Sequence, residues 1–477
     1  MIYTNQTKII CTIGPVSDSV EVMKQLTEAG MDVMRMNFSH GNHEEHKQRL
    51  ERLHQVNEEL GTNVASLLDT KGPEIRTHSF KDGKVTIVEG SKVTVRMEEV
   101  EGNEQEFSVN YPLLYRDMEV GQVILVDDGY LELTVEKIDD KKKIIICRAE
   151  NTHEVKNRRG INVPGVKLNL DFISKKDYAD IVFGCENNVD FIAASFVRRA
   201  SDVQEIKNIM KYNGNKSIKV IAKIENKEGV ENIDEIIDIA DGIMIARGDL
   251  GVEVPAEDVP VIQKSIINKC LAKGKVSVTA TQMLESMIDH PRPTRAEVSD
   301  VANAIYDGTD AIMLSGESAI GQYPVESVEM MVKIAKTIEG QVDRRDIVKR
   351  ANKQSNSSRE IETSIAISVA YTVIQSKVDL IIVPTMTGST AMYLSKFRPN
   401  APILALTPTE ESAKSLKLHS GVYPVHFDLV SDVETVVSKS LKLVKEKYGV
   451  KVGNRVIITG GFPIGAPTNG MRIIDVK

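Results

Sequence analysis

Eight short apolar runs, each followed by polar or glycine residues, most constrain how this chain can fold. They span residues 8–14, 32–38, 64–69, 191–196, 219–225, 242–248, 276–281 and 311–316. Amphipathic helical stretches lie between most of them; Val22, Leu26 and Ala29, for example, share a helical face that ends at Gly30. Such alternation is typical of parallel β/α units, and eight units fit a (β/α)8 TIM barrel. We therefore assign residues 1–71 and 171–340 to a catalytic barrel.

Residues 72–170 separate the third and fourth runs and have a different pattern. Val93 and Val95 alternate with polar residues, as do Leu131 and Leu133, with a turn at 127–129. This pattern predicts an inserted antiparallel β-barrel domain. Because the insertion leaves from the C-terminal end of a barrel strand, it can fold over the barrel mouth as a lid.

Residues 341–477 predict a third domain of doubly wound α/β type. After a polar stretch at 343–359 we expect a helix over 361–376, strands over 380–384, 401–406 and 455–459, and a helix that contains Val433, Val437 and Val444. We assign a regulatory role to this domain.

Charge and composition exclude two classes of partner. The net charge is -8 and the sequence pI is about 5.8, which is opposite in sign to a large nucleic-acid footprint. No stretch approaches the roughly 18 to 20 apolar residues of a membrane span. The four cysteines are widely spaced and Met1 begins no secretory leader. We therefore expect a cytoplasmic protein whose cysteines are buried and unpaired.

Polar residues at the ends of the second and third strands converge on one place. Arg35, Asn37 and Ser39 alternate with apolar residues and so share one strand face, while Asp69 and Thr70 end the next strand. Four of these residues offer only oxygen ligands of the kind that a hard cation prefers: Asn37, Ser39, Asp69 and Thr70. The alternative is that they only cap the strands, as Ser and Asn often do.

The fifth and sixth strands supply a lysine and two carboxylates. Lys223 and Glu225 are two residues apart and point the same way into the mouth, and Asp249 follows the sixth strand. Glu225 and Asp249 form a candidate Mg2+ or Mn2+ site, and Lys223 could neutralise charge on a transferred phosphoryl group. A plain ion pair between Lys223 and Glu225 is the alternative. Phosphoryl transfer is the reaction class that uses all these groups together.

Two other motif readings are not favoured. Neither a P-loop nor a glycine-rich dinucleotide fingerprint follows a strand. His40, His43 and His46 are three apart, but on a polar helix start we expect solvated side chains and no metal site.

Six motifs, in this order, resemble the signatures of the pyruvate kinase family. They are MNFSHG at 36–41, DTKGPEIR at 69–76, KIEN at 223–226, ARGDLG at 246–251, ATQML at 280–284 and LSGE at 314–317. The resemblance extends over the whole chain and implies transfer of the phosphoryl group of phosphoenolpyruvate to ADP, which gives pyruvate and ATP. It also implies a divalent ion, Mg2+ or Mn2+, together with K+.

The resemblance implies a role for each matching residue. Lys223 would stabilise the phosphoryl group in flight, Arg35 would hold the phosphate, and Thr281 and Ser315 would help protonate the enol. Thr281 and the backbone amides of Gly248 and Asp249 would hold the substrate carboxylate. The metal ligands would be Glu225 and Asp249 for Mg2+, and Asn37, Ser39, Asp69 and Thr70 for K+.

The nucleotide would contact Arg76 and Arg159. Arg159 stands at a position that resembles a lysine in much of the family, and a guanidinium and an ammonium group are not interchangeable.

The resemblance also implies a homotetramer and a phosphorylated allosteric activator. The loop after the strand at 380–384 is rich in hydroxyl groups and leads into a helix, which favours an anion site. A second glycine-rich stretch, 460–469, could close over the same ligand. The effector-binding residues would be Thr385, Thr387, Gly388, Ser389 and Thr390. Both loops could instead be ordinary β/α turns.

Two other functions compete with this interpretation. One is a different metal-dependent barrel that acts on phosphoenolpyruvate or pyruvate, such as an aldolase or lyase. It would leave Arg76, the K+ cluster and the lid without a role. The other is a catalytically silent sugar-phosphate sensor, against which the intact Lys223, Glu225 and Asp249 argue.

Overall fold

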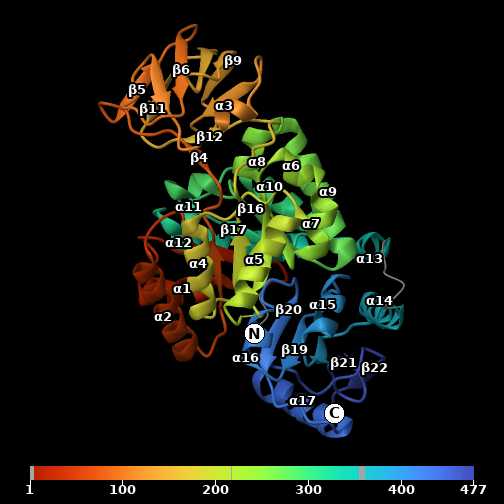
Figure 1. The fold of residues 1–477 in the computed structure, drawn as a ribbon. Helices are drawn as coiled ribbons and strands as arrows, with labels where there is room; N and C mark the ends of the chain where they lie inside the picture. The colour runs from red at the N-terminus through yellow and green to blue at the C-terminus, as the bar shows by residue number, and fades with distance from the viewer. Residues whose placement is uncertain (1–4, 216, 354–359) are drawn as a thin grey trace.

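The computed structural model describes residues 5–215, 217–353 and 360–477, which form three parts in a row. The inserted lid stands at one end of the barrel and the C-terminal domain lies at the opposite end (Figure 1). The barrel therefore has one end that faces the lid and one that faces the C-terminal domain.

The barrel is closed, in the strand order β1-β17-β16-β15-β14-β13-β3-β2, and every neighbouring pair is parallel. Its strands are β1 (Lys8–Thr12), β2 (Val33–Asn37), β3 (Ala65–Asp69), β13 (Phe191–Ala194), β14 (Lys219–Ile224), β15 (Gly242–Ala246), β16 (Val276–Ala280) and β17 (Ala311–Leu314). All eight lie within the apolar runs of the sequence, so the predicted TIM barrel is confirmed.

Helices surround the barrel because their apolar faces need the outer surface of the strands. They are α1 (Val20–Ala29), α2 (His43–Leu60), α4 (Lys175–Glu186), α5 (Ala200–Tyr212), α6 (Lys227–Glu231), α7 (Ile233–Ile239), α8 (Arg247–Glu253), α9 (Val259–Lys273), α10 (Arg295–Asp307), α11 (Gly316–Ala319) and α12 (Pro324–Glu339), with 3-10 turns at Ala256–Asp258 and Glu285–Ile288. Side-chain caps set several starts: Asn42 accepts the amide of Glu45, and Ser174 forms a capping box with Asp177.

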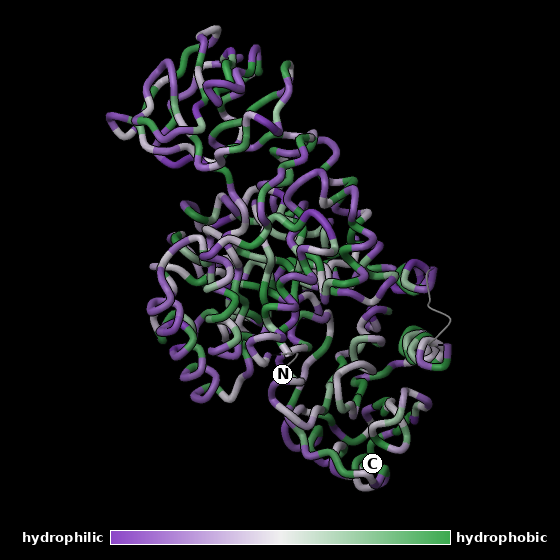
Figure 2. The backbone as a smooth tube through the Cα atoms, viewed as in Figure 1, coloured by the Kyte–Doolittle hydropathy of each residue, from purple (hydrophilic) through white to green (hydrophobic). Residues whose placement is uncertain are grey.

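Two apolar layers hold this part together. Met36, Phe38 and Ile224 belong to the layer between strands and helices, while Leu67 and Ile221 fill the barrel interior. Hydrophobic segments accordingly concentrate in the centre of the molecule (Figure 2). Alternate strand residues therefore face opposite layers, which leaves inward-facing polar side chains to gather at the barrel ends.

The lid contains one seven-stranded sheet in the order β4-β12-β8-β9-β10-β6-β7 and a two-stranded sheet of β11 and β5. Its elements are β4 (Ile75–Arg76), β5 (Lys84–Ile87), β6 (Lys92–Arg96), β7 (Glu106–Ser108), α3 (Leu114–Asp117), β8 (Val123–Val126), β9 (Leu131–Asp139), β10 (Ile144–Ala149), β11 (His153–Lys156) and β12 (Gly160–Asn162). The insertion is rich in β-strands as predicted, but its strands form these two sheets and not one closed barrel, and one pair is not antiparallel. The pair of β6 and β7 is parallel, because residues 97–105 carry the chain back before it re-enters the sheet.

The C-terminal domain is built on a five-stranded sheet in the order β20-β19-β18-β21-β22. Its elements are α13 (Arg344–Asn352), α14 (Glu360–Gln375), β18 (Leu380–Pro384), α15 (Ser389–Ser395), β19 (Ile403–Thr407), α16 (Glu410–Lys414), β20 (Val422–His426), α17 (Val433–Lys447), β21 (Arg455–Gly460) and β22 (Gly470–Asp475). Helices α14 and α15 pack with one apolar layer and α17 with another, as a doubly wound domain requires. The polar stretch at 343–359 contains α13, while its residues 354–359 lie outside the described part.

Two further observations bear on the predictions from composition. Within the described ranges, no helix combines the length and the apolar character that crossing a membrane requires. All four cysteines are buried and unpaired, as expected.

Candidate active site

Lys223, which faces inward near the end of β14, is the centre of a buried cluster at the barrel mouth. Its ammonium nitrogen lies 2.9 Å from Glu225 Oε1, 3.1 Å from Asp69 Oδ1 and 2.8 Å from the Ser195 hydroxyl. Burial alone would lower the pKa of Lys223, but the two carboxylates raise it above its ordinary value. Lys223 is therefore a fixed positive charge at the mouth.

Arg35 brings a second positive charge to the mouth from β2. Its Nε donates to Asp69 Oδ2 at 2.6 Å, and its Nη1 donates to the Thr12 hydroxyl at 2.8 Å. Burial would raise the pKa of Asp69, but Arg35 and Lys223 together lower it below its usual range. Asp69 is thus an ionised carboxylate that fixes both cations.

Glu225 and Asp249 are the other buried carboxylates of the cluster. Glu225 accepts the backbone amide of Phe196 at 2.6 Å, and Asp249 lies in the first turn of α8. Burial raises the pKa of Glu225 to about 7, and the neighbouring charge of Asp249 adds to the effect, although Lys223 opposes it. Burial also raises the pKa of Asp249.

The donor set at Glu225 and Asp249 fits a divalent cation. Three carboxylates, those of Asp69, Glu225 and Asp249, face only two cationic side chains, Lys223 and Arg35. A bound cation would relieve the excess of negative charge. No group of three or more His, Cys, Asp or Glu side chains placed to hold a metal occurs among residues 5–215, 217–353 and 360–477. Substrate and water oxygens would complete the shell, as is common for Mg2+.

The four residues predicted to hold a monovalent cation lie together at the ends of β2 and β3. Asn37 and Asp69 are register partners, and the Asn37 side chain accepts the Ser39 amide at 3.0 Å. The Thr70 carbonyl accepts the Ser195 hydroxyl at 2.7 Å. Their side-chain and backbone oxygens are hard, neutral or anionic donors, and this chemistry fits a monovalent ion such as K+.

Thr281 follows β16 in an unusual backbone conformation. Its φ is 67°, a strained region for a β-branched residue. The Gly248 amide donates to the Thr281 hydroxyl at 2.8 Å, which brings together two residues predicted to hold the substrate carboxylate. Arg247 Nη2 donates to the Thr281 carbonyl at 2.6 Å, while Arg247 Nη1 is anchored to Asp300 at 2.6 Å. Arg247 therefore stabilises the strained turn.

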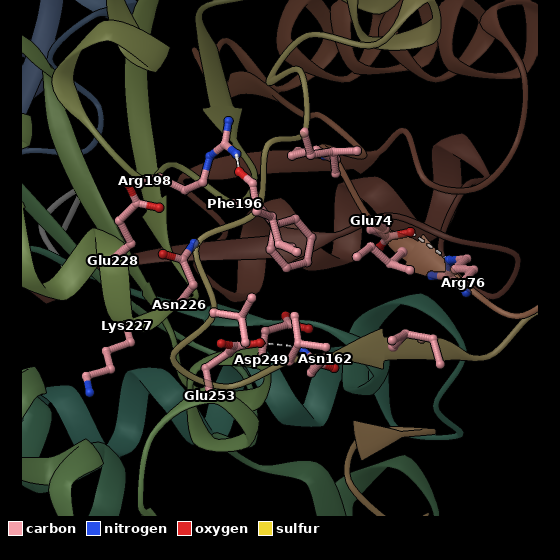
Figure 3. A pocket seen from close by; sticks show the side chains of 18 of the residues that line it. Glu74, Arg76, Asn162, Phe196, Arg198, Asn226, Lys227, Glu228, Asp249 and Glu253 are labelled. Atoms are coloured by element: carbon pink, nitrogen blue, oxygen red, sulfur yellow. Dashed lines mark hydrogen bonds and ion pairs between the residues drawn. The ribbon is translucent and has the colours of Figure 1, made fainter. Parts of the chain in front are cut away.

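A cavity of about 430 Å³ lies between the lid and the barrel mouth. Figure 3 shows Glu74, Arg76 and Asn162 of the lid with Asp249 and Glu253 of α8 around it. Asn162 Nδ2 donates to Glu253 Oε1 at 2.9 Å, so the lid contacts the barrel directly. A cavity of this size suits a small polar ligand held between the two domains.

Both arginines predicted to contact the nucleotide line this cavity from the lid side. Arg76 donates to Glu74 at 2.7 Å and to the Arg158 carbonyl at 2.9 Å. Arg159 Nε lies 3.4 Å from Asp127 Oδ1 but has no hydrogen-bond partner among the described residues. The Arg159 side chain is nevertheless 40% exposed, so the rest of the guanidinium can face a ligand in the cavity.

Ser315, a predicted catalytic residue, has no direct hydrogen bond to Lys223 or Thr281 within the described residues. It follows β17, and its backbone amide donates to Glu317 Oε2 at 2.8 Å.

The predicted effector loop after β18 uses two of its hydroxyls internally. The Thr385 hydroxyl accepts the Gly388 amide at 3.1 Å, and the Thr390 and Thr468 hydroxyls are 2.7 Å apart. The second contact joins the loop to the stretch 460–469. The helix that follows, α15, has seven residues and is preceded by Gly388 in a left-handed conformation.

His46 does not behave as its sequence context suggests. It was predicted to be solvated, but it is only 1% exposed and its ring stacks on Phe38 at 3.9 Å between centroids. The reason is that His46 lies on the face of α2 that packs against the barrel. His40 is exposed, and His43 contacts Asp180 at 2.7 Å.

Ser195 is the member of the cluster that sequence reasoning missed. Its hydroxyl contacts Lys223, Asp69 and the Thr70 carbonyl. A signal for it existed, because Ser195 is two residues after Ala193, which fills the barrel interior.

A TIM barrel whose covered mouth combines a buried lysine, an arginine and paired carboxylates defines a metal-dependent phosphotransferase. Comparison with known proteins gives the same result. Residues 4–328 match the model of the pyruvate kinase barrel domain, and residues 363–474 match that of the pyruvate kinase alpha/beta domain. The chain therefore belongs to the pyruvate kinase family and has the pyruvate kinase function.

Individual relatives agree with this assignment over nearly the full chain. The pyruvate kinases of Sporosarcina psychrophila and Geobacillus stearothermophilus are both 50% identical to it, over 98% of this chain and 80% of each relative. A crystal structure of a pyruvate kinase from Cryptosporidium parvum is 39% identical, covers 99% of this chain and 97% of its own, and superposes with a TM-score of 0.94. These relatives are named pyruvate kinases, which favours that function over the aldolase, lyase and silent-sensor alternatives.

Proposed function

We propose that the barrel mouth transfers the phosphoryl group of phosphoenolpyruvate to ADP with Lys223 as the central residue. The observation that carries the proposal is the contact of its ammonium group with Asp69, Glu225 and Ser195 in a buried site. A cation held rigidly where negative charge develops stabilises a transition state more than a mobile one, because it needs no reorganisation.

The substrate would be held by groups on either side of Lys223. Arg35 is oriented by Asp69 and Thr12 and would bind the phosphate. The carboxylate would lie against Thr281 and the amides of Gly248 and Asp249, where Arg247 stabilises the backbone. These contacts would align the phosphoryl group with the nucleotide cavity.

Two cations fit the site. We propose Mg2+, or Mn2+, at Glu225 and Asp249, and K+ at Asn37, Ser39, Asp69 and Thr70. When bound, the ions supply positive charge that neutralises the phosphate and carboxylate oxygens. Glu225 and Asp249 would then be held ionised, and Lys223 would be freed from part of its contact with Glu225.

The nucleotide would enter through the cavity under the lid. Arg76 and Arg159 line that cavity and would hold the phosphates of ADP. Because Arg159 lines the cavity with a partly exposed side chain, it would bind phosphate through a planar fork where an ammonium group would act as a point charge.

After the transfer, the enol needs a proton, and we assign that step to Thr281 and Ser315. The Thr281 hydroxyl already accepts from Gly248 and donates to the Ala280 carbonyl at 2.6 Å. The Thr281 hydroxyl would therefore act as a relay. It would pass a proton toward the enol by way of a water molecule or Ser315, and would not be the original source of that proton.

We also propose the domain limits 1–71 with 171–340, 72–170 and 341–477, a cytoplasmic location and a homotetramer. Four unpaired buried cysteines support a reducing compartment. Exposed Ile361 on α14 and exposed Ile473 on the edge strand β22 support self-association through the C-terminal domain. A phosphorylated activator would act through the loop 385–390.

The test is formation of pyruvate from phosphoenolpyruvate with and without ADP. We expect pyruvate and ATP in equal amounts. We expect the reaction to require both Mg2+ and K+. Formation of pyruvate without ADP would point to a phosphatase or lyase and would overturn the proposal.

A further inference from the structure

Ser195 is a buried serine that lies between the central lysine and two of the residues proposed to hold K+. It follows β13 at the barrel mouth and is only 2% exposed. Its hydroxyl oxygen lies 2.8 Å from Lys223 Nζ, 2.7 Å from the Thr70 carbonyl oxygen and 3.1 Å from Asp69 Oδ1. A single hydroxyl group therefore contacts both the lysine and the proposed cation site.

The number of hydrogens decides the direction of these hydrogen bonds. An ammonium group carries donors only, so the Ser195 oxygen accepts from Lys223. A hydroxyl group has one hydrogen to donate, and the Thr70 carbonyl is its nearer acceptor. Ser195 thus links the two groups in a chain of hydrogen bonds from Lys223 to Thr70. Removal of its oxygen would leave the buried ammonium group one acceptor short and the carbonyl one donor short.

The position of the Ser195 oxygen is itself fixed by the surrounding chain. The Ser195 amide donates to the Thr70 hydroxyl at 3.1 Å, so two hydrogen bonds join these residues. Gly72 packs against the same serine, and a Cβ atom at Gly72 would lie only 2.9 Å from Ser195 Cβ. The serine therefore cannot shift toward or away from Lys223 without displacing the chain beside it.

The next residue, Phe196, extends these contacts to the proposed divalent site. Its φ is 56°, in the left-handed region that a bulky residue rarely adopts. In this conformation its amide donates to Glu225 Oε2 at 2.6 Å, while Glu225 Oε1 lies 2.9 Å from Lys223. Such strain persists only where the surroundings hold the backbone firmly. The turn at 195–196 thus holds two acceptors of Lys223, the serine hydroxyl and the glutamate carboxylate.

The hydrogen bond to Thr70 also bears on which monovalent ion the site accepts. The choice between ions of different radius depends on the size of the cavity and on the flexibility of its ligands. A carbonyl oxygen held by a fixed hydroxyl group cannot move in toward a small ion without stretching a 2.7 Å hydrogen bond. Such a restraint favours the larger K+ over Na+.

We propose that Ser195 is a positioning residue that couples the monovalent-cation site to Lys223. Its hydroxyl holds the ammonium group at the mouth, and the same hydroxyl keeps the Thr70 carbonyl from closing on Na+. The ion and the reaction rest on the function proposed above, whereas the hydrogen bonds belong to the chain alone. A change at this one oxygen therefore alters both the turnover rate and the choice of cation.

Equilibrium dialysis of the full chain with radiolabelled Tl+, an ion close to K+ in radius, measures cation binding without turnover. K+ and Na+ compete in turn for the site in the parent, in Ser195→Ala and in a matched control, Ser66→Ala. Ser66 is a buried serine near the start of β3, away from the mouth, and its hydroxyl contacts Asp190 at 2.8 Å. We expect the preference for K+ over Na+ to fall several-fold in Ser195→Ala and to stay unchanged in Ser66→Ala.

Steady-state kinetics at saturating K+ measures the second effect. We expect kcat of Ser195→Ala to fall about tenfold or more, because Lys223 is no longer held in line with the phosphoryl group. KM for phosphoenolpyruvate should change less, since the serine does not belong to the proposed substrate contacts. Ser195→Cys keeps a weak donor and acceptor of similar size and should give intermediate values in both measurements. If Ser195→Ala does not fold, Ser195→Cys decides by the same two readouts.

The outcomes separate this inference from the function on which it rests. If Ser195→Ala keeps the parent's preference for K+, the hydroxyl does not act on the cation site and the coupling is wrong, whatever happens to kcat. If the preference changes but kcat does not, the hydroxyl does not position Lys223 and the coupling is again wrong. A parent that binds K+ no better than Na+ would overturn the K+ site itself, and the coupling with it.

Discussion

The ammonium group of Lys223 donates a 2.8 Å hydrogen bond to the hydroxyl of Ser195, whose oxygen also lies 3.1 Å from Asp69 Oδ1. Lys223 is thus held from two sides, by carboxylates and by a neutral hydroxyl. Because several groups hold its ammonium nitrogen, Lys223 does not move if only one of the carboxylates moves. It stays aimed at the mouth, where the phosphoryl group would pass.

Replacing Lys223 with Met should lower kcat by orders of magnitude and leave phosphoenolpyruvate binding within about tenfold, because only interactions stronger in the transition state raise the rate. Steady-state kinetics and direct substrate binding would measure the two effects. Circular dichroism provides the control for folding. Loss of folded protein would favour a purely structural ion pair, and full activity would exclude the catalytic role.

The monovalent cation requirement should depend on Glu74. Its carboxylate contacts Arg76 at 2.7 Å and Lys71 at 3.8 Å, close to the predicted K+ residues at the end of β3. We expect activity in K+ or NH4+ but little in Na+. Glu74→Lys should relax this requirement, since a fixed ammonium group can replace a mobile cation. Glu74→Gln is the matched control and should retain the requirement; equal rates of the parent in sodium and potassium would contradict the K+ site.

Arg247 should act as a positioning residue for Thr281. Arg247→Lys keeps the charge but loses the fork that joins the Thr281 carbonyl to Asp300, so the φ of 67° is no longer supported. We expect KM for phosphoenolpyruvate to rise about tenfold or more, with a smaller change in kcat. Thr281→Ser, which keeps the hydroxyl and relaxes the strain, serves as the comparison. An unchanged KM in Arg247→Lys would exclude this role.

The barrel and the residues at its mouth could be predicted because strand periodicity determines both. Alternation along β14 places Lys223 in the mouth and Ile224 against the helices, and the eight apolar runs match the eight strands. The same rule would have found Ser195, but a lone serine after a short strand resembles a turn residue.

Other features depend on contacts that no local pattern contains. The burial of His46 requires α2 to turn one face onto Phe38, and the parallel pair of β6 and β7 depends on the path of a loop. One cavity between the barrel and the C-terminal domain is lined by both Lys219 and Thr387, which are far apart in the sequence. Their proximity follows only from how two domains pack.

Regulation should be visible in the phosphoenolpyruvate saturation curve. A phosphorylated activator that binds the active conformation more tightly shifts the curve to lower substrate concentration and, by linkage, binds tighter when substrate is present. The measurement uses fructose 1,6-bisphosphate, ribose 5-phosphate and a nucleoside monophosphate in turn. Thr387→Glu should abolish the response, because its carboxylate repels phosphate, and should leave basal activity unchanged; Thr387→Gln is the uncharged control. No response to any of the three in the parent would count against the regulatory role.

Acid should destabilise the protein partly through His46. Its Nδ1 accepts from Arg49 at 3.3 Å and its Nε2 lies 3.0 Å from the His40 carbonyl, an arrangement that suits a neutral ring. Burial lowers the pKa of His46 to about 4, below the roughly 6.5 of an unfolded chain.

Between these two values the unfolded state binds more protons than the folded state, so the stabilisation present above pH 6.5 is lost as the pH falls toward 4. Between pH 7 and pH 5 the loss should be about 2 kcal/mol. Thermal unfolding of the parent and of His46→Gln at both pH values measures it. His46→Gln should be less stable than the parent at pH 7 but lose less on acidification, and an equal loss in both proteins would show that His46 is not the group responsible.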